Sequence, residues 1–150
     1  MAEEYVEGKD LILYKWNTVD TEWEPVACAT DNSFETTLNF LESITKCDES
    51  TRRRPTSKNY TSSISGLVST KASQISGKVY SDILQEEADN MTKSWYAIYT
   101  PEVTDKTFEK YFEAYINSIS FAAAREDNMT FDAELAIDGD AVNTDPFATT

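Results

Sequence analysis

The clearest hydrophobic pattern in this chain lies between residues 111 and 137, YFEAYINSISFAAAREDNMTFDAELAI. In the second half of that stretch, apolar residues occupy every other position, at Met129, Phe131, Ala133, Leu135 and Ile137. Alternate side chains of a strand point to opposite faces, so this half predicts a strand with one buried face and a fixed register. The whole stretch predicts a long β-hairpin.

The first half of the predicted hairpin is apolar on both faces. One face would carry Tyr111, Tyr115, Ile119 and Phe121, and the other Phe112, Ala114, Ile116 and Ala122. A strand that is apolar on both faces needs a cover on each, and a second copy of the chain or a helix near Ile83 could supply one of them. Tyr111, Tyr115, Ile119 and Phe121 are therefore candidate residues for a subunit interface.

Shorter runs predict the rest of a mainly β fold. They indicate a first hairpin over 10–16 and 23–30, a third strand over 33–44, and strands over 59–69 and 93–100. Gly66 inside one of these strands marks a bulge or a close approach of two backbones. Val79, Ile83, Leu84 and Ala88 have helical spacing and predict one short amphipathic helix. Seven or eight strands with a single helix predict an antiparallel β-sandwich or barrel.

The segment from Lys46 to Lys58, KCDESTRRRPTSK, has neither period nor apolar content, and it predicts a long polar loop. It holds Lys46, Arg52, Arg53, Arg54 and Lys58, five of the 13 basic residues of the chain. Two main interpretations are open, a solvated loop or an arm that docks on an acidic surface of another subunit. Phosphate binding is a third.

Length and composition favour one globular domain over 1–150, with a core over about 8–138 and a polar C-terminal tail over 139–150. The net charge of −14 disfavours a basic nucleic-acid-binding surface. An acidic excess serves solubility, or it suits a surface that DNA must pass without binding. No apolar run is long enough for a transmembrane helix, and the N-terminal residues lack signal-peptide features, which favours a reducing compartment.

Candidate chemistry is sparse. The chain has no histidine, which removes His-based catalysis and most zinc sites, and it has no glycine-rich phosphate-binding motif. We therefore expect no catalytic residues, no metal site and no cofactor, although Asp138, Asp140, Asn143 and Asp145 give a weak hint of calcium. Cys28 and Cys47 are interpreted as free thiols, with a disulfide as the alternative. Trp16, Trp23 and Trp95 belong to a core or subunit interface, or else to a sugar-binding face.

Several motifs, taken in order, resemble the major tail tube proteins of long-tailed bacteriophages. They are Gly8 to Tyr14 (GKDLILY), Val26 to Thr30 (VACAT), Ser65 to Leu67 (SGL), Ala114 to Ser120 (AYINSIS), and Arg125 to Asn128 (REDN) followed by Thr130 and Phe131. The similarity spans about 8–138. The chain departs from the family's pattern at RRRP, at Tyr60 where tryptophan is frequent, and in a longer acidic tail.

The resemblance implies a structural virion protein without enzymatic activity, made and assembled in the host cytoplasm. Its copies would form hexameric rings stacked into a tube, and DNA would leave through the lumen without specific binding. Tape-measure, tail terminator or baseplate proteins would be its partners, and it would contact no membrane. In this interpretation the basic 46–58 segment is an arm between subunits or rings. The alternative is a β-sandwich module that binds a receptor or a carbohydrate.

Overall fold

A computed structural model describes residues 11–43, 52–70, 72, 74–100, 108–123, 125 and 128–147. Within these residues, seven strands and one helix follow each other. They are β1 (Ile12–Asn17), β2 (Glu22–Pro25), β3 (Ala29–Ser43), β4 (Arg52–Leu67), α1 (Ser81–Asp89), β5 (Ser94–Tyr99), β6 (Glu109–Ala122) and β7 (Thr130–Val142). The predicted mainly β fold with a single short helix is confirmed, as is the long hairpin, which is β6 and β7.

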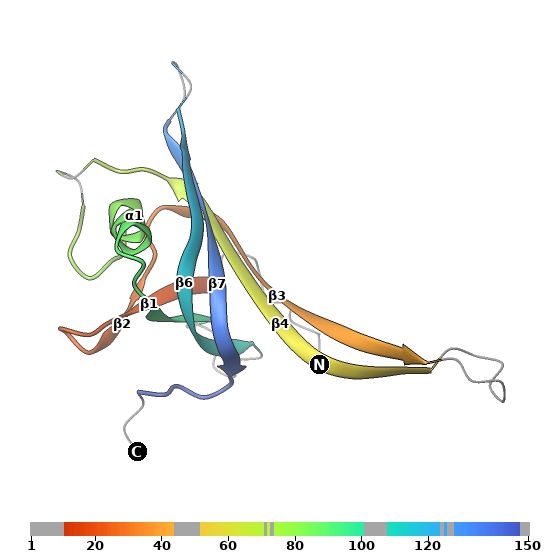
Figure 1. Ribbon diagram of the computed structural model, residues 1–150. Coiled ribbons are helices and arrows are strands. Elements are labelled where there is room, and N and C mark those ends of the chain that lie inside the picture. The colour runs from red at the N-terminus through yellow and green to blue at the C-terminus, as the bar shows by residue number, and fades with distance from the viewer. Residues whose placement is uncertain are drawn as a thin grey trace, which may run out of the picture.

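All seven strands belong to one antiparallel sheet, in the order β2-β1-β5-β6-β7-β4-β3. The sheet is strongly coiled, so that β1 and β2 run across the direction of β6 and β7 (Figure 1). The side-chain amide of Asn32 in β3 donates from Nδ2 to the carbonyl of Leu11, just before β1, at 3.0 Å. The expected sandwich or barrel is therefore a single sheet curled toward a barrel, and not two stacked sheets.

The main core lies on the inner face of this curled sheet, where α1 covers it. Its largest fully buried side chains include Tyr96, Phe112, Phe131, Leu13 and Leu84. Leu84 comes from α1, and Ile83 packs against the same cluster. The predicted helix is confirmed from Ser81 onward, and it covers the core; Val79 lies before it and forms a bridge with Val26 instead.

The predicted first hairpin is confirmed as β1 and β2, but its second strand is shorter than the predicted 23–30, because β2 ends at Pro25 and β3 begins only at Ala29. Between them the backbone bonds to three other parts of the chain. The amide of Val26 donates to Leu13 O at 3.0 Å, that of Ala27 donates to Val79 O at 2.7 Å, and Cys28 O accepts from Leu67 N at 2.9 Å. Cys28 also has a φ of +63°, which no regular strand allows. This connector anchors the helix segment to the sheet.

The C-terminal strand is longer than expected. β7 continues to Val142, four residues beyond the predicted boundary of the tail at Asp138. Gly139, with a φ of +82°, lies where the register between β6 and β7 shifts. No helix among the described residues is long and apolar enough to cross a membrane.

Candidate assembly surfaces

The most prominent surface feature is a two-stranded ribbon formed by β3 and the first part of β4. β7 pairs with β4 only between Thr61 and Leu67, whereas β3 pairs with β4 back to Arg52. The part of β4 before Thr61 therefore has β3 as its only partner among the described strands. This ribbon projects away from the rest of the molecule (Figure 1).

The ribbon corrects the prediction of a polar loop over 46–58. Residues 52–58 belong to β4, and residues 44–51, including Lys46, lie outside the described residues. Pro55, which cannot donate to a ladder, lies opposite Phe40 at a register shift and on an edge that no described strand covers. Residues 52–58 have no alternating apolar side chains of their own. They form a strand because they pair with β3, whose apolar side chains do alternate.

The two faces of the ribbon differ in chemistry. On the face continuous with the core, the register places Phe34 and Leu38 of β3 opposite Ser62 and Lys58, and Phe40 opposite Pro55. Phe34 packs on Phe112, with ring centroids 5.5 Å apart, but Leu38 is 43% exposed and Phe40 51% exposed. The other face has polar pairs such as Asn39 with Ser57, whose side chains are hydrogen-bonded at 2.8 Å, and one exposed apolar side chain, Leu41, opposite Arg54. The ribbon therefore extends the apolar face of the sheet into solvent.

The predicted basic cluster lies along the outer half of this ribbon. Arg53 and Arg54 are exposed, Lys58 is exposed opposite Leu38, and Arg52 begins β4. The Arg53 Nε atom lies 3.0 Å from Glu42 Oε1, in an ion pair with both side chains more than half exposed. Exposed ion pairs contribute little to stability, so this pair does not prevent Arg53 from contacting a carboxylate on another surface.

A second surface is the outer face of the sheet formed by β3, β4, β7 and β6. Strand register aligns its side chains in rows. One row runs Asp31, Ser65, Asp132 and Ser120, and the next runs Ser33, Ser63, Glu134 and Ser118. Nearly all of these residues are exposed. This part of the sheet therefore presents only hydroxyls and carboxylates in its two central rows.

Neighbouring side chains in these rows bond to each other. The Ser33 and Ser63 hydroxyls are 2.7 Å apart, and Ser65 Oγ donates to Asp132 Oδ1. At the border of the face, Lys93 Nζ lies 3.2 Å from Asp138 and 3.6 Å from Glu113. The hydrogen bond to Asp138 and the charge of Glu113 raise the pKa of Lys93, so this cation is held by two carboxylates.

The predicted interface residues of the long hairpin do not share one face. The register shifts between Ile116 and Ser118, so Asn117 is an extra residue in β6 and the alternation reverses. Tyr111 is buried at 2% exposure, and Tyr115 is exposed on the outer face. Ile119 packs on the main core, and Phe121 lies opposite Phe131, on the inner face. The assignment of these four residues to a single face is wrong.

Aromatic residues of β1, β2, β5 and β6 form a second cluster on the outer face, at the opposite end of the sheet from the ribbon. It comprises Tyr14, Ala97 and Tyr111 with Ile12, Trp23, Trp95 and Tyr99 around them. The C-terminal segment covers it. Phe147 stacks on Trp16 with centroids 4.0 Å apart, and Trp23 Nε1 donates to Asp145 at 3.0 Å. Trp16, Trp23 and Trp95 thus contact this chain's own Phe147.

Burial sets the electrostatics of both clusters. It raises the pKa of Tyr96, Tyr99 and Tyr111, and the hydroxyl of Tyr111 also donates to Glu109. On the helix side, Glu87 of α1 accepts from Lys15 at 3.0 Å, with side chains 12% and 15% exposed. Ser94 Oγ adds a bond to the same carboxylate at 3.0 Å. This small polar network fixes the helix to β1 and β5.

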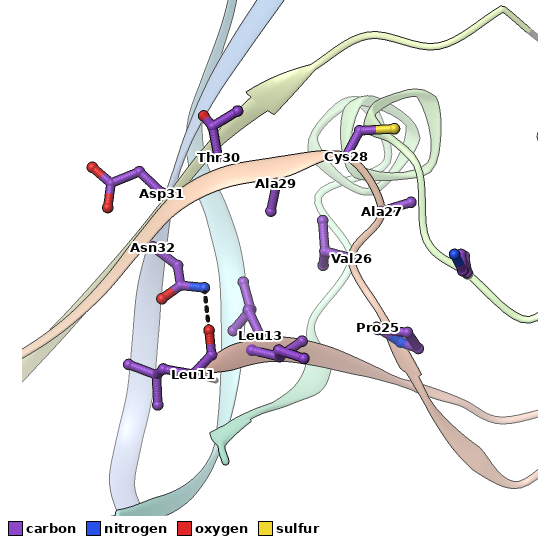
Figure 2. A pocket seen from close by; sticks show the side chains of 12 residues that line it. Leu11, Leu13, Pro25, Val26, Ala27, Cys28, Ala29, Thr30, Asp31 and Asn32 are labelled. Carbon is purple, nitrogen blue, oxygen red and sulfur yellow. Dashed lines mark hydrogen bonds between the residues drawn. The ribbon is translucent and has the colours of Figure 1, made fainter. Parts of the chain in front are cut away.

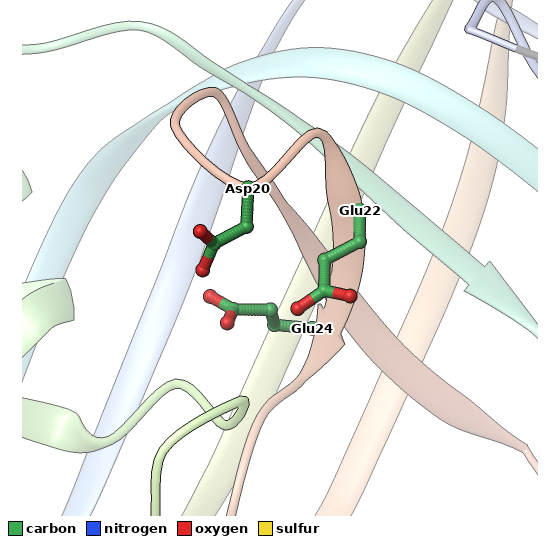
Figure 3. A group of neighbouring side chains, drawn as sticks. All are labelled: Asp20, Glu22 and Glu24. Atoms are coloured by element: carbon green, nitrogen blue, oxygen red, sulfur yellow. The ribbon is translucent and has the colours of Figure 1, made fainter.

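Among the described residues, one group of acids could hold a cation. Asp20, Glu22 and Glu24 bring carboxylate oxygens within 4.8 Å of one another around the turn between β1 and β2 (Figure 3). Glu24 accepts from Asn17 at 3.0 Å, so its carboxylate already has a partner. Asp145 likewise bonds to Trp23 and to the Phe147 amide, and Asp138 to Lys93. Those two side chains of the suggested calcium site are thus held by protein groups.

Sequence reasoning missed the exposed apolar side chains of the ribbon as candidate functional residues. Leu38 and Phe40 were assigned to a strand, but nothing indicated that the strand leaves the body. A signal was available: the alternating strand is followed in the sequence by a basic, serine-rich segment, and that segment has no apolar face that could cover Leu38 and Phe40. The hydroxyl rows had a signal too, in the Ser and Thr residues between 57 and 65.

Comparison with known proteins gives matches in structure only. No family model matches the chain, and no curated protein matches it. A chain from the tail of an empty gene transfer agent particle, refined with C6 symmetry, superposes with a TM-score of 0.75 at 12% identity, over 94% of this chain and 100% of the other. The tail tube of SPP1 gives 0.69 at 12% identity, over 90% and 77%. The baseplate of the anti-feeding prophage gives 0.67 at 9% identity, over 95% and 96%. The chain therefore has the fold found in these tail assemblies.

Proposed function

We propose that this protein is the structural subunit of a phage-type tail tube, assembling into hexameric rings that stack around a passage for DNA. The observation that carries the proposal is the ribbon of β3 and β4. Its apolar face extends beyond the core, and its side chains Leu38 and Phe40 are exposed. A fold shared with C6-symmetric tail chains supports the same conclusion.

The ribbon requires a partner for physical reasons. Two-stranded ribbons are marginal in water on their own, and exposed apolar faces mark interaction sites. The described body of the chain does not cover this face, because the ribbon points away from it (Figure 1). A neighbouring copy can, and repeated contacts between different surfaces of identical subunits generate rings or stacks.

The hydroxyl and carboxylate rows suit the lumen of such a tube. Asp31, Glu35, Asp132 and Glu134 all lie on the outer face of the sheet. Carboxylates repel DNA phosphates, while serine hydroxyls keep the wall hydrated. A passage lined in this way lets a polyanion slide without binding, which is the property that a conduit needs.

The same proposal places the protein in the virion tail after assembly in the host cytoplasm. Its partners would be other copies of itself, together with tape-measure, tail terminator or baseplate proteins at the tube's length and ends. It assigns no catalytic residue, metal or cofactor. Packing of Phe147 over Trp16 and Trp23 argues against an open sugar-binding platform, the alternative function.

Electron microscopy of the purified protein tests the proposal. At high concentration we expect negatively stained rings or tubes with six-fold symmetry. The double variant Leu38→Ser and Phe40→Ser should keep its circular dichroism spectrum yet lose assembly, because both side chains are exposed in the isolated protomer. A wild-type protein that stays strictly monomeric at high concentration would refute the function.

A further inference from the structure

The structure contains a pocket that the proposed function leaves unused. It has a volume of about 780 Å³ and lies between the start of β1, the connector from Pro25 to Cys28, and the start of β3. Its apolar lining comes from Leu11, Leu13, Val26, Ala27 and Ala29, and Cys28 and Asn32 line it as well (Figure 2). Its size is typical of pockets that hold a small organic group.

We propose that this pocket receives the exposed apolar side chains of the ribbon, Leu38 and Phe40, from a second copy of the chain. The inference rests on the proposed function and deepens it, because it names the surface of the neighbouring copy on which the ribbon docks. The contact is heterologous: ribbon and pocket are different surfaces, so each copy donates one ribbon and receives another.

Geometry requires that the contact be between copies. Ala29 and Phe40 are both in β3, and at about 3.3 Å per residue an extended strand places them roughly 35 Å apart. The strand is held in its ladder with β4, so it cannot fold back on its own pocket. A head-to-tail contact is the arrangement in which both apolar surfaces become buried.

Chemistry on both sides agrees with this pairing. The ribbon offers a leucine and a phenylalanine beside Lys58 and Arg53. The pocket offers an apolar floor, with Leu13 and Val26 belonging to the main core. Cations on the ribbon would also be steered toward a body that carries the negative excess of the chain.

Cys28 at the pocket allows a direct test by cross-linking. The assembled protein would carry Cys47→Ser, which leaves Cys28 as its native thiol, together with Phe40→Cys on the ribbon. A short bismaleimide should join Cys28 of one copy to position 40 of the next and give a ladder of linked dimers, trimers and higher species. The matched control is Asn39→Cys, one residue away on the polar face of the ribbon, and its linked fraction should be at least tenfold lower.

A second measurement is the reactivity of Cys28 itself. We expect rapid labelling of the thiol in diluted monomers and at least tenfold slower labelling in assembled rings. Slow labelling already in monomers would mean that another segment of the same chain fills the pocket, and it would overturn the inference.

The remaining outcomes separate this inference from the proposed function. Rings that form normally without cross-links from position 40, or with equal cross-linking from positions 39 and 40, would show that the ribbon docks elsewhere; the tube function would stand. A wild-type protein that never leaves the monomeric state would refute both.

Discussion

Replacing Gly66 by alanine tests how closely the chain is packed where the connector crosses the sheet. A Cβ atom at this position would lie 2.5 Å from the carbonyl oxygen of Cys28 and 2.8 Å from Cε1 of Phe131. Neither neighbour can withdraw freely. The Cys28 carbonyl accepts a 2.9 Å bond from Leu67 N, and Phe131 is only 1% exposed in the core.

The magnitude follows from two opposing effects. Overpacking a well-filled site costs about 1–3 kcal/mol. Gly→Ala also restricts the unfolded chain, which favours folding by about 0.4–1 kcal/mol. We therefore expect a net loss of about 1–2 kcal/mol in the free energy of unfolding. For a chain of this size that lowers the melting temperature by about 2–8 °C.

Urea unfolding followed by tryptophan fluorescence measures this loss. Assembly stabilises folded copies, so the comparison belongs at concentrations where the midpoint is independent of protein concentration. Phe131→Leu supplies a double-mutant cycle. If the new methyl group clashes with the phenylalanine ring, the double variant should lose less stability than the sum of the two single losses, by about 0.5 kcal/mol or more. An unchanged or raised midpoint for Gly66→Ala would refute the packing argument, and strict additivity would exclude the ring as its cause.

Three further predictions concern the ribbon, the helix and the buried tyrosines. Replacing Arg52, Arg53 and Arg54 together with glutamate should leave the far-ultraviolet circular dichroism unchanged and block tube growth in electron micrographs, because the ribbon would then repel an acidic neighbour; tubes of normal length would contradict the docking role. Glu87→Gln should lower the free energy of unfolding, measured in urea, by about 2 kcal/mol, since it removes the charged partner of Lys15. Glu42 is exposed, and Glu42→Gln should lower it by less than about 0.5 kcal/mol. Tyr96, Tyr99 and Tyr111 have raised pKa values in the folded state, so the unfolded chain binds fewer protons above pH 10 and stability should fall as the pH rises beyond that point. Ultraviolet titration should then show these tyrosines ionising only together with unfolding, and their smooth ionisation in the folded protein would contradict the burial.

The elements that the sequence predicted well are those whose own side chains determine the structure. Phe131, Ala133 and Leu135 alternate without interruption, and all three are buried in β7. The helical spacing of Ile83 and Leu84 places both against the core. Gly66 was identified as a bulge or a point of close approach because a glycine inside a strand marks such positions, and in the structure the Cys28 carbonyl occupies the space that a Cβ atom would need.

The missed features depend on partners that a single segment does not encode. Residues 52–58 form a strand because β3 lies beside them, and they carry no apolar period that would reveal it. The bulge at Asn117 reverses the faces of β6, yet asparagine in a strand gives no distinctive signal. The candidate interface residues Ile119 and Phe121 were therefore assigned to the wrong face. The docking of Phe147 on Trp16 joins residues too distant in sequence for any local pattern to indicate.

The ribbon links the stability of one copy to the presence of the next. β3 is an edge strand of 15 residues, and among the described strands it pairs with β4 alone. A long, open edge invites uncontrolled pairing, which proteins oppose with charge, and Asp31 and Glu35 place carboxylates along this one, on the face opposite Leu38 and Phe40. The same acids leave the apolar side of the ribbon, at Leu38 and Phe40, as its attractive surface. Association through side chains that fit a pocket, and not through bare backbone, then limits each copy to a neighbour in one orientation, as a tube of uniform diameter requires.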